Sequence, residues 1–114
     1  MGLDIYAQPS EDEELAEEDI QAFKEADIAL CGGILSGNGD DGSFRGKVYS
    51  DLVYKITGRS LYYEWTPPEI VGRMYQKLKS VNSSDYPGQE DDIENLRRFF
   101  KVCIDKNLGL YGWW

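Results

Sequence analysis

A proline pair in the middle of the chain fixes where one helix begins, and it is the strongest local constraint on the fold. Thr66 precedes Pro67 and Pro68, which suit a first helical turn because proline has no amide proton to leave unpaired there. Glu69 stands where a glutamate can reach back to the start of the helix. Apolar residues then recur at helical spacing. We predict a helix over residues 67–81, capped by the Thr66 hydroxyl.

Two further segments show the same periodicity of three and four residues. Residues 44–57 end at Gly58, a residue type that favours the left-handed conformation after a helix. Residues 90–106 open with three acids, which stabilise the positive end of a helix dipole, and we expect Gly109 to end this helix. The helices at 67–81 and 90–106 should bury Met74, Leu78, Leu96, Phe100 and Ile104 against each other.

Acidic side chains crowd the first third of the chain. Residues 1–41 hold twelve of the 21 acids and a single base, Lys24, whereas residues 42–114 carry nine acids and eleven bases. The Ser10 and Glu13 spacing matches a capping box, so we predict an acidic amphipathic helix over residues 11–31. Asp19 falls on its apolar side. It therefore either caps a second helix starting at Ile20 or needs a cationic partner.

Short alternating runs predict the strands. Leu3, Ile5 and Ala7 alternate with polar residues, and residues 61–65 alternate in the same way. The last residues, 108–114, are typical of a terminal strand, and we expect its two closing tryptophans to pack into the body. A chain of 114 residues suffices for one core. We predict a single α+β domain with about four helices packed on a small sheet of three or four short strands.

The residue types exclude several kinds of catalysis. The chain has no histidine, which removes serine–histidine and cysteine–histidine pairs and zinc bound by histidine. Cys31 and Cys103 are too far apart in sequence for a zinc-binding pair, and we interpret both as reduced, buried core residues. No catalytic constellation is recognisable, so we expect neither a cofactor nor a bound metal. The sequence favours a protein that is not an enzyme.

A glycine-rich loop at residues 32–46 is the main candidate for a site that binds a small ligand or a metal ion. Its GxGxxG pattern formally matches a dinucleotide-binding motif, but adjacent aspartates would repel a pyrophosphate. Its oxygen-bearing side chains suit calcium, although the loop fails the EF-hand pattern. A plain loop is the favoured interpretation. A small-ligand or calcium-binding protein, or an enzyme using residues 36–46, remains the alternative, with the candidate ligand-binding residues Gly37, Asn38, Gly39, Asp40, Asp41 and Arg45.

The segment after this loop, residues 42–81, interleaves basic and aromatic side chains. Its net charge is +4, and such interleaving is typical of surfaces that bind single-stranded nucleic acid. The whole chain carries −9, which opposes attraction to phosphates. We therefore do not expect nucleic acid as a partner.

The split in charge favours a protein partner with a basic surface. Like-charged residues four apart on a helix destabilise it, so the acidic run suggests a purpose beyond folding. We predict a non-catalytic interaction module, such as an inhibitor, an immunity protein or a counter-defence factor. A competing hypothesis is that the acids neutralise residues 42–81 within the same chain. The candidate partner-binding residues are Glu11, Glu14, Glu17 and Glu18.

The opening residues bear on origin. Met-Gly-Leu-Asp-Ile-Tyr resembles the start of small uncharacterised bacterial and phage proteins, a resemblance that covers six residues and implies a bacterial-type cytosolic protein. No basic stretch followed by an apolar run of signal-peptide length is present, and no run is long enough to span a membrane. We expect a cytoplasmic protein.

Overall fold

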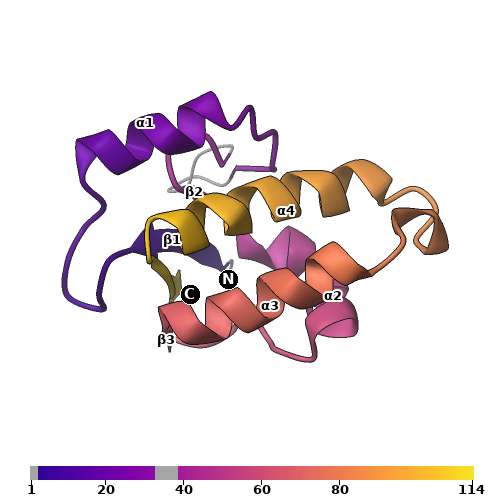
Figure 1. The fold of residues 1–114 in the computed structure, drawn as a ribbon. Helices are drawn as coiled ribbons and strands as arrows, with labels where there is room; N and C mark the ends of the chain where they lie inside the picture. The colour runs from indigo at the N-terminus through magenta and orange to yellow at the C-terminus, as the bar shows by residue number, and fades with distance from the viewer. Residues whose placement is uncertain (1–2, 33–38) are drawn as a thin grey trace.

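The computed structural model describes residues 3–32 and 39–114, which form a four-stranded sheet and four α-helices (Figure 1). The predicted α+β class is confirmed. In chain order the elements are β1 (Asp4–Gln8), α1 (Glu17–Glu25), β2 (Ser43–Arg45), α2 (Gly46–Thr57), β3 (Trp65–Thr66), α3 (Pro68–Ser80), the short 3-10 helix η1 (Ser83–Asp85), α4 (Glu90–Asp105) and β4 (Gly109–Trp113).

The sheet is antiparallel, with strand order β2-β1-β4-β3. The terminal strand β4 lies in its centre, where it pairs with β1 from Asp4 opposite Trp113 to Gln8 opposite Gly109. β2 was not predicted, because its three residues are too few to show alternation and their pairing is set by β1. The helix predicted over 44–57 therefore starts two residues later, at Gly46, because Phe44 and Arg45 belong to β2. The predicted run at 61–65 contributes only its last residue to β3, which continues to Thr66.

The hydrophobic core lies between one face of the sheet and the helices. Side chains alternate between the faces of a strand, so Ile5 and Ala7 of β1 point into this core and are buried, as is Leu3 just before the strand. Figure 1 shows α4 running between α1 and α3. Where α1, β2 and α4 meet, Phe99 packs against Phe23 and Phe44, with ring centroids 4.8 Å apart in both pairs.

The packing of α3 against α4 agrees with the prediction except at one position. Met74, Leu78, Leu96 and Phe100 are buried, whereas Ile104 is only partly buried. The start of α3 is also confirmed, but the cap is wrong. Pro67 occupies the N-cap and no side chain caps the helix, because Thr66 belongs to β3, where its side chain is buried.

The acidic helix is much shorter than the predicted 11–31. Ser10 Oγ donates a hydrogen bond to Glu13 Oε1 at 2.9 Å, but this closes a local turn and not a helix. The first helical turn forms only where the amides of Asp19 and Ile20 reach the Ala16 carbonyl, so α1 begins at Glu17. Asp19 therefore does not cap a second helix at Ile20.

The C-terminal ends of α2 and α4 were predicted to lie at Gly58 and Gly109. Gly58 is left-handed, with φ 75°, and its amide donates to the Tyr54 carbonyl, as predicted. α4 instead ends at Asp105, and the left-handed residue after it is Asn107, with φ 56°. Asparagine tolerates this conformation better than most residues, which frees Gly109 to begin β4.

No helix among the described residues has both the length and the apolar character needed to cross a bilayer.

Candidate functional site

The face of the sheet that points away from the helices carries polar and aromatic side chains. Directly opposite residues share a face, so Tyr6 of β1 stands beside Ser43 of β2 and Tyr111 of β4, and Tyr111 stands beside Trp65 of β3. A second row across the sheet joins Arg45, Asp4 and Trp113. We call this surface the open face.

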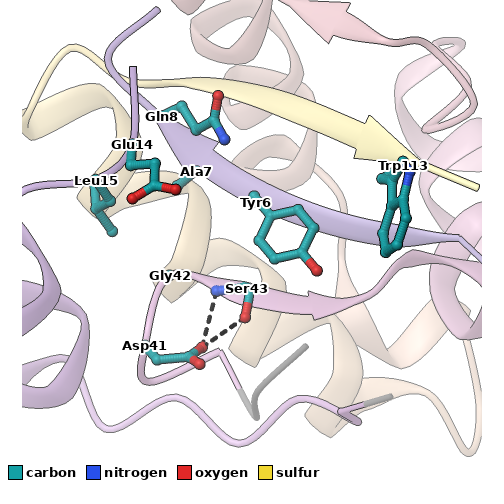
Figure 2. Close-up of a pocket in the computed structure, with 9 residues that line it drawn as sticks. All are labelled: Tyr6, Ala7, Gln8, Glu14, Leu15, Asp41, Gly42, Ser43 and Trp113. Carbon is teal, nitrogen blue, oxygen red and sulfur yellow. Dashed lines mark hydrogen bonds between the residues drawn. The ribbon is translucent and has the colours of Figure 1, made fainter. Parts of the chain in front are cut away.

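A cavity of about 380 Å³ lies at the β1 and β2 end of the open face (Figure 2). The segment between β1 and α1 brings acidic and apolar side chains to it, and the turn before β2 brings a second carboxylate. Its lining among the described residues consists of Tyr6, Ala7, Gln8, Glu14, Leu15, Asp41, Gly42, Ser43 and Trp113.

The turn before β2 holds Asp41 in a defined orientation. Asp41 Oδ1 accepts hydrogen bonds from the Ser43 amide at 3.1 Å and the Ser43 hydroxyl at 2.8 Å, both dashed in Figure 2. Gly42 is left-handed, with φ 84°, and its carbonyl accepts from the Ala7 amide at 2.8 Å. A Cβ at Gly42 would collide with the side chain of Leu15. Glycine is thus required where this turn meets both β1 and the segment before α1.

The cavity has a negative electrostatic character. Burial raises the pKa of the Tyr6 phenol, and the charges of Asp4 and Asp41 raise it further. Its lining includes the carboxylates of Glu14 and Asp41 and, among the described residues, no lysine or arginine. Gln8 Oε1 is buried and has no hydrogen-bond partner in the described part of the chain. The two carboxylates therefore present charged hydrogen-bond acceptors to a ligand.

The four predicted partner-binding glutamates are all exposed, but they do not share one helix face. Glu17 and Glu18 lie in the first turn of α1, where negative charge suits the helix dipole. Glu11 and Glu14 lie in the preceding non-helical segment. The expected like-charge repulsion four residues apart on a helix is therefore wrong for the pair Glu14 and Glu18. Glu14 alone of the four lines the cavity.

The candidate residues of the glycine-rich loop have separate surroundings. Gly37 and Asn38 lie outside the described residues. Gly39 is left-handed and its amide donates to the Ser43 carbonyl at 2.8 Å, while Asp40 is exposed.

Asp41 and Arg45 also lie in different surroundings. Asp41 lines the cavity, whereas Arg45 sits in β2 opposite Asp4, with its amide bonded to the Cys31 carbonyl at 2.8 Å. Within residues 3–32 and 39–114, no three His, Cys, Asp or Glu side chains are grouped so as to hold a metal ion.

The two cysteines differ, contrary to the prediction that both are buried. Cys103 is fully buried in α4, and burial raises the pKa of its thiol. Cys31 is exposed, because its backbone and not its side chain faces the body. Its amide donates to the Tyr49 hydroxyl at 2.6 Å, and its carbonyl accepts from the Arg45 amide.

The basic and aromatic middle segment forms a second exposed surface. The Arg59 guanidinium lies 3.7 Å from the centre of the Tyr63 ring, a cation–π contact. Tyr62 meets Trp114 edge to face, with centroids 5.8 Å apart. Trp113 and Trp114 are about half exposed, at 49% and 50%, so the expectation that they pack into the body is wrong for their rings although it holds for the strand before them.

The sequence interpretation overlooked Tyr6, Gln8 and Trp113 as site residues. Tyr6 and Gln8 form the polar half of the alternation in β1, the half that points away from the core. Tyr6 could have indicated the site from sequence, because an aromatic ring at an outward-facing position of the strand must lie on the open face. Trp113 joins them only because β4 pairs with β1.

No family model, curated protein or solved structure matches this chain. The resemblance of its first six residues to small bacterial and phage proteins therefore stays a prediction.

Proposed function

We propose that this protein is a non-catalytic interaction module that binds a basic surface on another protein. The observation that carries the proposal is the exposure of four glutamates that have no ion-pair partner among the described residues, Glu11, Glu14, Glu17 and Glu18. All four are exposed, and none forms an ion pair within the part of the chain that the structure describes. A concentrated, unneutralised charge of this kind attracts and orients a partner of opposite sign.

The competing hypothesis, neutralisation within the chain, receives no support from the ion pairs. Asp19 does find a cationic partner, but it is Lys106, just after α4, with Oδ1 and Nζ 4.0 Å apart, and Lys106 lies outside residues 42–81. Most of the other ion pairs lie within α4 itself. The acids of residues 11–18 are thus available to a partner.

The resemblance of the opening residues narrows the proposed role. A cytoplasmic protein of bacterial or phage type with an acidic, non-catalytic surface suits the tasks of an inhibitor, an immunity protein or a counter-defence factor. A member of any of these classes can act by covering a basic site on another protein. The absence of histidine from the chain agrees with a role that needs no proton transfer near neutral pH.

Association kinetics with a defined basic peptide test the proposal. The probe is an acetylated, amidated peptide with four lysines separated by glycines, measured by biolayer interferometry at several salt concentrations. Replacing Glu11, Glu14, Glu17 and Glu18 together by glutamine should slow association by about tenfold at low salt, and added salt should slow the wild type in the same way. Circular dichroism checks folding, because losing Glu17 and Glu18 from the first turn of α1 costs a few tenths of a kcal/mol.

A matched control separates the acidic segment from net charge. The quadruple variant Asp51→Asn, Glu64→Gln, Glu69→Gln and Asp85→Asn removes the same charge from exposed residues elsewhere. Its association rate should fall by less than twofold. Equal slowing in both variants would show a general effect of net charge and would overturn the proposal.

A further inference from the structure

We propose that the cavity on the open face binds the ammonium group of a lysine side chain on the partner protein. This inference rests on the proposed function and specifies one contact within it. The cavity brings together two residues that the sequence had placed in different candidate sites, Glu14 from the acidic segment and Asp41 from the glycine-rich loop.

The polar groups of the lining match a ligand that only donates hydrogen bonds. Glu14 and Asp41 approach from different segments, and neither is ion-paired within the described residues. A lysine ammonium carries three donors and no acceptor. It would supply the positive charge that this lining lacks.

The apolar part of the lining suits the rest of a lysine side chain. Leu15 offers aliphatic surface for the methylene stem, which lysine commonly buries while its charged end meets polar groups. Tyr6 and Trp113 add two aromatic rings, and Figure 2 shows the indole standing across from the phenol. Aromatic rings attract ammonium groups through cation–π interactions. The volume of about 380 Å³ lies at the small end of the usual range for ligand pockets, about 300–1,000 Å³.

The geometry of Asp41 favours lysine over arginine. Ser43 occupies Asp41 Oδ1 with two hydrogen bonds, so one carboxylate oxygen remains for a ligand. The arginine guanidinium binds best to both oxygens of one carboxylate through two parallel hydrogen bonds. A lysine ammonium is a compact charge that can instead take one oxygen from each of two carboxylates. Glu14 and Asp41 are the two carboxylates in the lining of this cavity.

Nuclear magnetic resonance titration tests the inference directly. The probe is acetyl-Gly-Gly-Lys-Gly-Gly-amide, and the reporter is the indole N–H resonance of Trp113, assigned by its loss in Trp113→Phe. The lysine peptide should shift this resonance. The same peptide with norleucine, which keeps the stem but lacks the charge, should not, and the arginine peptide should bind more weakly than the lysine peptide.

Isosteric variants then locate the contact. Glu14→Gln and Asp41→Asn should each weaken lysine-peptide binding by about tenfold, the effect of losing one charged hydrogen bond. Asp12→Asn and Glu25→Gln remove the same charge from exposed residues outside the cavity. They should weaken binding by less than twofold.

Several outcomes would overturn the inference. Equal effects of Glu14→Gln and Asp12→Asn would show that charge acts from a distance and that the cavity holds no lysine. Tighter binding of the arginine peptide would replace lysine by arginine. Binding of n-butylamine as tight as that of the peptide would make a free small amine the occupant. In one outcome, Glu14→Gln and Asp41→Asn leave binding of the lysine peptide unchanged, while the quadruple glutamine variant still slows association with the four-lysine peptide. That outcome would overturn the lysine contact in the cavity but leave the proposed function standing.

Discussion

The two faces of the sheet are made from the same strands but have opposite characters. The inner face buries Ile5, Phe44 and Leu110 almost completely. Their neighbours on the open face, Tyr6, Arg45 and Tyr111, remain partly accessible. Within one strand a shift of a single residue therefore moves a side chain from the packed core to the surface that lines the cavity.

This difference separates the residues that hold the fold from those that are free to serve a partner. Burial of apolar surface is the main favourable contribution to folding, and it is concentrated on the inner face. A half-exposed aromatic residue such as Trp113 gains less from burial in the isolated chain. Its remaining surface is available to a ligand. Stability and binding should then respond to different substitutions.

The largest effect is expected from Phe44→Ala on the inner face of β2. Phe44 is fully buried and touches the rings of Tyr49 and Phe99, so its truncation should cost about 3–5 kcal/mol of unfolding free energy. Arg45→Ala, on the open face of the same strand, should cost less than about 1 kcal/mol. Urea denaturation measures both. Similar losses in the two variants would remove the distinction between the faces.

A substitution at Gly109 tests how closely the open face is packed between β4 and β3. A Cβ there would lie 2.5 Å from the Thr66 carbonyl oxygen and 2.6 Å from the Trp65 ring, so Gly109→Ala should cost about 1–3 kcal/mol by overpacking. Gly72, in α3, has nothing within 4 Å of the same position. Gly72→Ala should therefore stabilise the protein by about 0.5–1 kcal/mol. Thermal melts that fall for both variants would contradict this account.

Much of the helical framework could be predicted from sequence, because its determinants are local. The proline pair places the start of α3, and Gly58 places the end of α2. Local patterns failed where two structures share one pattern. The spacing of Ser10 and Glu13 occurs in a capping box and in the isolated turn that the chain adopts. An asparagine can also take the left-handed position after a helix in place of a nearby glycine, as Asn107 does here in place of Gly109.

The cavity could not be predicted, because long-range pairing creates it. Its lining comes from β1, the segment before α1, the turn before β2 and the end of β4. Strand β4 meets β1 only through the register that puts Asp4 opposite Trp113, and nothing in either segment specifies that register by itself. The sequence identified Glu14 and Asp41 separately. Only the fold shows that they line the same cavity.

Trp113→Ala should lower stability only slightly but weaken binding strongly. The ring is about half exposed, so we expect a loss of about 1 kcal/mol, well below that of Phe44→Ala. Binding of the lysine peptide should fall at least as much as in Glu14→Gln, because the variant removes one aromatic wall of the cavity. Calorimetric titration and urea denaturation on the same sample measure the two effects. A large loss of stability with unchanged binding would assign Trp113 to the core.

The smallest effect concerns the phenol of Tyr6, and it appears only at high pH. Burial and the charges of Asp4 and Asp41 raise the pKa of Tyr6 in the folded state, whereas a tyrosine in the unfolded chain ionises at about pH 10. Above that pH the unfolded chain releases a proton that the folded chain retains, so stability falls as the pH rises towards the folded pKa. Below about pH 10 the phenol is protonated in both states, and the contribution of Tyr6 to stability is fully present.

Tyr6→Phe cannot ionise at this position, so the advantage of the wild type over this variant should be constant from pH 7 to 9 and shrink above about pH 10. Asp41→Asn removes one of the charges that oppose the phenolate. In that background the decline due to Tyr6 should be smaller, which separates the electrostatic contribution from burial. Urea denaturation across this pH range measures the change. Parallel pH profiles for the wild type and Tyr6→Phe would mean that the carboxylates do not act on the open face at Tyr6, and would weaken the case for a negative cavity there.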